Sequence, residues 1–152
     1  TKSFDFSNYL RAKYWLLFAV TCISYLLSLF YGFFNVKLIY THTACFLFNL
    51  GFNINIVLYF AMNNKKYLDL SKGATFNYQG VGLSNFVIIL PMMVLPVIIY
   101  APFGILGIPY TGLIIIGSIG VLGLIFNKAI QKAALKRFYQ KKYEMAEGFR
   151  QR

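Results

Sequence analysis

The sequence has very few acidic side chains. It contains four Asp or Glu residues against 15 Lys or Arg residues, and the acids are Asp5, Asp69, Glu144 and Glu147. All four lie outside the long apolar stretches, so neither a catalytic carboxylate pair nor a proton relay is expected inside those stretches. We therefore expect that the chain is not an enzyme and does not couple transport to protons. A membrane-embedded enzyme stays open only if further sequence supplies the acids.

Metal ligands and catalytic motifs are also scarce. One histidine and two cysteines are too few to supply three or four ligands from a single site, so we predict no metal site and no cofactor. No phosphate-binding loop occurs, because the stretch Ser71–Thr75 lacks the required spacing and first glycine. Neither a G-x-S-x-G elbow nor an H-E-x-x-H motif is present. Cys22 and Cys45 fall in apolar stretches and are predicted to be buried, inert thiols.

Long runs without charge dominate the rest of the sequence. Hydrophobic residues make up 59% of the chain and charged residues 12%, and the windows 14–36, 38–64 and 73–127 contain no Lys, Arg, Asp or Glu. About 18 apolar residues suffice for a helix to cross a bilayer, and the last window is long enough for two crossings. The sequence thus predicts an all-α polytopic membrane protein with four transmembrane helices. Their expected bounds are about 14–34, 38–62, 81–100 and 108–126, with the outer turn at residues 101–104, where a partly re-entrant hairpin is the alternative.

The positions of the cations predict the orientation. Three cations lie in residues 1–13, three in residues 63–80 and eight in residues 127–152, whereas the two remaining loops hold only Lys37. Cytoplasmic loops carry the excess of Lys and Arg. Both termini and the 63–80 loop are therefore expected in the cytoplasm. The net charge of +11 then reflects topology and membrane contact, and no nucleic acid partner is expected.

The tail at residues 127–152 has a helical pattern. Ile130, Ala134, Leu135 and Phe138 recur at helical spacing, while lysines occupy another side. This pattern predicts a C-terminal basic amphipathic helix that contacts the anionic surface of the bilayer.

The loop at residues 63–80 permits two interpretations. It is either a solvated connector whose lysines contact lipid headgroups, or a docking element formed by a short amphipathic helix with a glycine cap. In the second case the candidate contacts with a cytoplasmic partner are Lys65, Lys66, Asp69, Lys72 and Gly73.

Polar residues form a stripe on the second predicted span. At 100° per residue, His42, Asn49 and Asn53 lie on one side of the helix, and Asn55 points elsewhere. Polar side chains in hydrocarbon normally face a bundle interior or a wet cavity. The stripe is expected either to form interhelical hydrogen bonds or to line a substrate path.

Proline and glycine mark the last two predicted spans. Pro91 and Pro96 interrupt the hydrogen bonding of the third span, so they are candidate hinges or only shape the helix. The fourth span contains glycines that allow close packing of helices; its small residues are Gly112, Gly117, Ser118, Gly120 and Gly123.

Three parts of the sequence resemble a known group of proteins. They are FAMNNKKYLDLSKGATFNYQGVG at residues 60–82, the proline-broken span after it, and KYEMAEGFR at residues 142–150. They resemble the carboxy-terminal part of a poorly characterised group of bacterial membrane proteins related to ABC-type exporter permeases. The resemblance covers most of this chain but only about the last third of such a permease. It implies that the chain is a piece of a longer protein in the bacterial cytoplasmic membrane.

The resemblance also implies partners. It implies a separate ATP-binding subunit that contacts the 63–80 loop, and a homo-oligomer or the remainder of a longer permease that completes the pathway. The first hypothesis for function is accordingly the permease part of an ATP-driven exporter. The alternative is a membrane scaffold or assembly subunit that packs against other helices and transports nothing.

Overall fold

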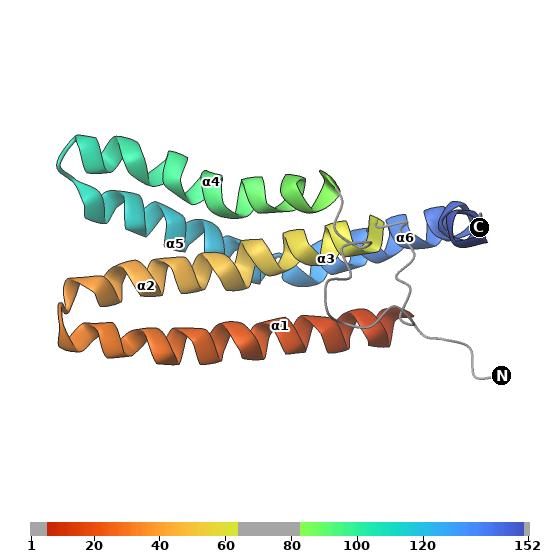
Figure 1. The fold of residues 1–152 in the computed structure, drawn as a ribbon, viewed down its shortest axis with the longest axis horizontal. Coiled ribbons are helices and arrows are strands. Elements are labelled where there is room, and N and C mark those ends of the chain that lie inside the picture. The colour runs from red at the N-terminus through yellow and green to blue at the C-terminus, as the bar shows by residue number, and fades with distance from the viewer. Residues whose placement is uncertain (1–5, 64–82, 151–152) are drawn as a thin grey trace.

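The computed structural model describes residues 6–63 and 83–150, and this part of the chain contains helices and no strand (Figure 1). The all-α class predicted from the sequence is confirmed. Two segments depart from regular α-helix, namely the 3-10 turn η1 and the π-helix η2. The elements are α1 (Phe6–Ser28), η1 (Leu29–Phe33), α2 (Lys37–Phe48), η2 (Asn49–Asn53), α3 (Ile54–Asn63), α4 (Leu83–Ile105), α5 (Pro109–Ile125) and α6 (Asn127–Arg150).

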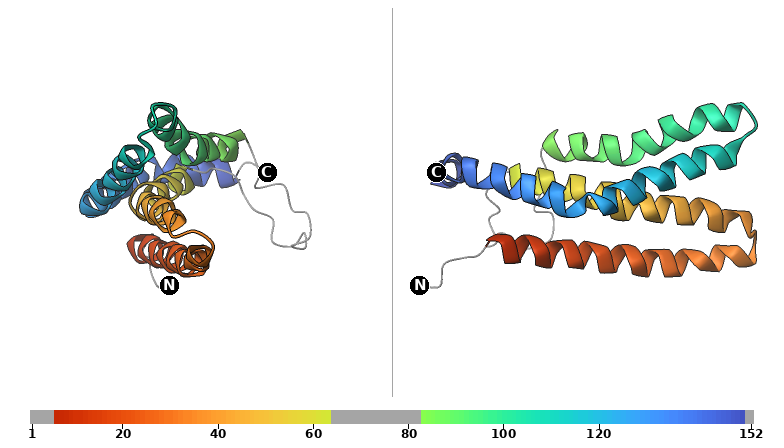
Figure 2. Two further views of the ribbon diagram at one scale, coloured as in Figure 1. Left: turned by 90° about the vertical axis from the view of Figure 1, so that its left-hand side faces the viewer. Right: turned by 180° about the vertical axis from the view of Figure 1, so that it is seen from behind.

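The helices run antiparallel and form an elongated bundle (Figures 1 and 2). The start of α1, the end of α3, the start of α4 and the C-terminal part of α6 lie at one end, which we call the tail end. The turns between η1 and α2 and between α4 and α5 lie at the other, the turn end. Along the bundle, α1 packs on α2 and α3, α2 packs on α5, and α4 packs on α5.

Two of the helical segments are long and apolar enough to cross a membrane. They are Ser7–Phe33 and Lys37–Phe60, and a third candidate is α5 together with the first part of α6, which bend by 59° relative to each other. The part of α4 whose side chains are described, Ile89–Ile105, is apolar but shorter. The fold therefore contains two to three candidate spanning helices, fewer than the four predicted.

The turn between the last two apolar helices differs from the prediction. It was expected at residues 101–104, but α4 continues to Ile105 and the chain turns at Gly107, which has φ +74°. The N–H of Ile108 donates to the carbonyl of Phe103 (2.9 Å) and that of Gly107 to the carbonyl of Gly104 (3.2 Å). These are the two hydrogen bonds of a Schellman motif, which ends a helix at a left-handed residue. The predicted turn was therefore wrong, because the stop signal is Gly107 followed by Pro109.

The first helix also starts earlier than the predicted span. It begins at Phe6 and runs through Arg11 and Lys13, whose side chains are exposed. A charge-free window finds the apolar part of a helix but not its end, because long cationic side chains reach outward from a continuing helix. At the turn end, Lys37 is the first residue of α2 and does not lie in the turn.

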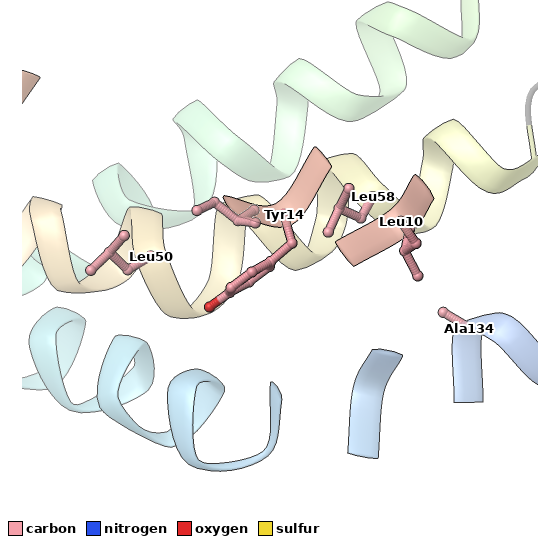
Figure 3. Close-up of a cluster of buried hydrophobic side chains, with 6 residues drawn as sticks. Leu10, Tyr14, Leu50, Leu58 and Ala134 are labelled. Atoms are coloured by element: carbon pink, nitrogen blue, oxygen red, sulfur yellow. The ribbon is translucent and has the colours of Figure 1, made fainter. Parts of the chain in front are cut away.

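Two apolar clusters hold the bundle together. The cluster nearer the tail end joins α1, η2, α3 and α6 (Figure 3), and its buried residues are Leu10, Tyr14, Leu50, Ile54, Leu58 and Ala134. The second cluster joins α2 to α5, and its buried residues are Ala44, Phe48, Leu113 and Ile116. The α2–η2–α3 segment contributes to both clusters and is thus the central element of the bundle.

The basic C-terminal helix packs against the bundle. Ala134 is buried and Leu135 half-buried in the first cluster, whereas the sequence predicted only a helix that contacts the bilayer surface. The side chain of Asn127 hydrogen bonds to Tyr14 of α1 and accepts a hydrogen bond from Gln131 (3.0 Å). The other side of this helix is exposed and cationic; its lysines are Lys128, Lys132 and Lys136.

Candidate functional site

A small cavity between α1 and α2 gathers polar side chains in a bundle whose outer surface is largely apolar. Its volume is about 250 Å³, and we call it the polar groove. Large apolar side chains flank it on the surface of α1; Ile23 and Leu27, for example, are 57% and 62% exposed. The lining residues are Val20, Thr21, Ser24, Tyr25, Ser28, His42, Cys45, Phe46 and Asn49.

Stacked rings fix the walls of the polar groove. The ring of Tyr25 stacks on Phe46 with centroids 4.2 Å apart, and the ring of Tyr31 stacks on His42 with centroids 5.4 Å apart. The hydroxyl of Tyr25 also hydrogen bonds to the hydroxyl of Thr43 (2.9 Å). These contacts join α1 and η1 to α2 and limit the rotamers of the side chains in the groove.

Several polar groups of the groove have unused hydrogen-bonding capacity. The hydroxyls of Thr21 and Ser28 donate to backbone carbonyls of their own helix (2.8 and 2.7 Å). Within the residues that the structure describes, neither Ser24 nor His42 has a hydrogen-bond partner. Ser24, Cys45 and Asn49 are exposed. The groove is therefore an open surface with free donors and acceptors.

The π-helix η2 begins at Asn49 in the groove wall, and two buried amides lie at its end and at the start of α3. The N–H of Ile54 donates to the carbonyl of Asn49, five residues earlier. The side-chain amide of Asn53 donates to Oδ1 of Asn49 (2.5 Å), and that of Asn55 donates to the carbonyl of Gly51 (2.7 Å). Asn53 and Asn55 are only 6% and 7% exposed, and Oδ1 of each has no hydrogen-bond partner. Short π-helical segments within α-helices often occur at functional sites.

The contact between η2 and α5 depends on three glycines. A Cβ atom on Gly51 would overlap the carbonyl oxygen of Gly120, and one on Gly123 would overlap that of Gly51. The two backbones are thus in direct contact, which only glycine allows.

A second cavity lies between α2 and α5. This apolar groove has a volume of about 920 Å³, and the rings of Tyr40 and Tyr110 meet edge to face near its turn end. Its lining includes Ile39, Leu47, Leu113, Ile114, Ser118 and Leu122. Few polar groups line it, so an apolar chain or the apolar face of another helix would fit into it. It presents few groups that could take part in a reaction.

The family of the chain is given by a match along its whole length. The family model described as a family of unknown function, DUF5687, matches residues 1–152. The chain belongs to the DUF5687 family. No curated protein and no solved structure matches it. For this DUF5687 member, proposals about function therefore rest on the site itself and on the resemblance stated above.

The polar residues predicted on the second span lie close together in the structure. His42 and Asn49 line the polar groove, and Asn53 is hydrogen bonded to Asn49 behind it. Pro91 and Pro96 are half-buried in α4, which is a single helix through both residues. The candidate partner contacts in the loop, Lys65, Lys66, Asp69, Lys72 and Gly73, lie outside the described residues.

The α1 side of the groove was missed in the sequence. Thr21, Ser24 and Ser28 are spaced three, four and seven residues apart, which puts them on one helical face. This spacing was an available signal on the first span. The prediction of buried cysteines was wrong for Cys45, which is exposed at the groove, while Cys22 is half-buried. Among the described residues, no group of three or more His, Cys, Asp or Glu side chains is placed to hold a metal ion.

Proposed function

We propose that the chain is the transmembrane permease part of an ATP-driven, ABC-type exporter in the bacterial cytoplasmic membrane, coupled to a separate ATPase subunit through the 63–80 loop. The observation that carries the proposal is a pair of buried amides with unpartnered oxygens: Asn53, which is hydrogen bonded to Asn49 of the polar groove, and Asn55, two residues further along the chain. A helical bundle that only packs has no use for such groups, because unsatisfied polar atoms destabilise a membrane protein.

Helix length supports four crossings. α4 has 23 residues and no charged side chain, so at about 1.5 Å per residue it is about 34 Å long. α5 has 17 residues, the lower limit for a spanning helix of about 17–25 residues. In the proposed topology these helices join the two longer segments in a four-span bundle, whose tail end carries Arg11, Lys13 and the lysines of α6 and whose turn end carries Lys37.

This topology predicts the accessibility of two introduced cysteines. In a background with Cys22→Ser and Cys45→Ser, Lys66→Cys should not react with a membrane-impermeant maleimide added outside intact cells. Val36→Cys, in the turn at the opposite end and 62% exposed, should react fully. The cationic tail end is expected on the cytoplasmic side. Labelling of position 66 from outside would overturn the four-span topology and the coupling through the loop.

The proposed coupling predicts that the ATPase subunit binds to the 63–80 loop. Replacing Lys65, Lys66 and Asp69 together by alanine should remove a copurifying ATPase subunit and its ATP hydrolysis from gently solubilised complexes, because these are the proposed contacts. The matched control replaces Lys128, Lys132 and Lys136, which are exposed at the same end but on α6, and should retain the ATPase. Absence of any nucleotide-hydrolysing partner from the unmodified complex would contradict the exporter function.

One observation favours the alternative function of a scaffold or assembly subunit. The apolar groove between α2 and α5 is large and has the character of a helix-packing surface. A scaffold would bind other membrane helices there, and substitutions of the buried amides would change its stability without changing ATP hydrolysis.

A further inference from the structure

We propose that the polar groove between α1 and α2 is the surface on which a second copy of the chain packs, so that the two grooves close on each other. The inference rests on the membrane location in the proposed function. It does not depend on the ATPase. It identifies which surface of the bundle is an interface and which chemistry holds that interface together.

The groove cannot face lipid without a penalty. Ser24, Cys45 and Asn49 are exposed at its surface, and Ser24 and His42 have no hydrogen-bond partner within the described residues. Hydrocarbon offers no donors or acceptors, so polar side chains within a membrane turn toward protein or water. The groove therefore needs a polar cover that the described chain does not supply.

The chemistry of the groove is complementary to itself. Carboxamide, hydroxyl and neutral imidazole groups each donate and accept hydrogen bonds, and the lining contains no charged side chain. A two-fold axis along the bundle brings the same patch of both copies together, so donors of one copy can meet acceptors of the other without repulsion between charges. An unrelated partner would have to provide this pattern by a separate arrangement.

The small side chains at the rim of the groove agree with close approach of a second helix. Ser24 and Cys45 are small, and small residues at an interface let two helices approach closely. The stacked pairs Tyr25–Phe46 and Tyr31–His42 hold the walls in place before association. The apolar groove on the other side of α2 lacks this set of polar groups, which makes the polar groove the favoured interface.

Cys45 provides a direct test in the unmodified protein. Mild oxidation of native membranes by oxygen with a copper catalyst, or treatment with a short bis-maleimide, should give a covalent dimer through Cys45 of both copies. The dimer should persist in Cys22→Ser and disappear in Cys45→Ser. Moving the cysteine to the apolar groove, with Cys45→Ser and Ile114→Cys, gives a control site that is 68% exposed and should not cross-link. Failure of both reagents at Cys45, or equal cross-linking at position 114, would overturn the proposal.

A matched pair of substitutions tests the polar contacts. Ser24→Leu should lower the dimer fraction at least about tenfold, because in a two-fold dimer each substitution acts twice. Ser118→Leu makes the same change on an exposed position of the apolar groove and should leave the fraction unchanged. A groove that holds a water-soluble ligand would instead leave the protein monomeric, with Cys45 open to polar maleimides, and that result counts against the interface.

The outcomes separate this inference from the proposed function. A monomeric chain that still copurifies with an ATPase would refute the interface and leave the exporter function standing. A Cys45-linked dimer without any ATPase would support the interface and refute the exporter.

Discussion

Gly120→Ala should strongly destabilise the bundle. A Cβ atom at this position would overlap the backbone carbonyl of Leu47 and would lie 2.5 Å from the backbone nitrogen of Phe48. No side chain can rotate away to make room, so α5 has to separate from α2 and η2 along their whole contact. Overpacking costs about 1–3 kcal/mol when side chains can adjust, and we expect about 3 kcal/mol or more here. The measurement is the unfolding midpoint of the purified protein in detergent.

Gly117→Ala is the matched control on the same helix. A Cβ atom there would lie 3.6 Å from a side-chain carbon of Leu47 and 3.8 Å from Cα of Ala44, which is ordinary van der Waals contact. Both variants change glycine to alanine within α5 and have the same effect on helix propensity. Equal unfolding midpoints for the two variants would contradict the direct backbone contact between α5 and the η2 region.

The sequence predicts the helices well because a long apolar run satisfies its backbone hydrogen bonds most simply as an α-helix. Each of the four expected spans overlaps a helical segment of the described residues, although only two to three of these segments are candidate spanning helices and α1 starts eight residues before position 14. The outer turn was misplaced for a specific reason. Pro102 and Gly104 suggest a turn, but both are tolerated near the end of a helix that stops before Gly107. Pro109 is the first residue of the next helix, a position that proline favours.

The candidate site could be predicted only in part. The spacing of His42 and Asn49 places them on one face whether or not the helix contains an irregular turn. The π-helix itself has no signature in its residues: its contact with α5 at Gly51 is tertiary, and the local hydrogen bond from the Asn55 amide to the Gly51 carbonyl is recognised only in the folded chain. The groove needs both walls, and its α1 wall follows only once α1 and α2 are known to be neighbours.

These features meet in one short stretch of chain. Within residues 49–55 the helix gains a π turn, Gly51 touches α5, and two amides are buried with unpartnered oxygens. This stretch also separates α2, which lines the polar groove, from α3, which leads to the 63–80 loop. A change in the π turn would rotate α3 relative to α2, so in the proposed exporter this stretch would link movement of the loop to the groove.

Asn53→Leu should therefore separate stability from activity. The unpartnered Oδ1 of Asn53 is buried, and such an atom costs about 1–3 kcal/mol, whereas the bond to Asn49 is worth about 0.6 kcal/mol in a membrane. Leucine of similar volume removes both, so the unfolding midpoint should stay the same or rise. ATP hydrolysis by the copurified complex should fall at least about tenfold, or about 1.4 kcal/mol in activation free energy.

The result discriminates between the two functions because they assign the amide different roles. In an exporter the buried oxygen is retained despite its cost, since it is satisfied in another packing of the helices or by the transported molecule. In a scaffold it has no such second partner, and Asn53→Leu should leave every activity of the assembly unchanged. Leu58→Met, a conservative change at a buried α3 residue of the cluster nearer the tail end, controls for small shifts in packing. A stability loss above about 2 kcal/mol in Asn53→Leu would show that Oδ1 is hydrogen bonded in the native membrane, which removes the argument for a second packing.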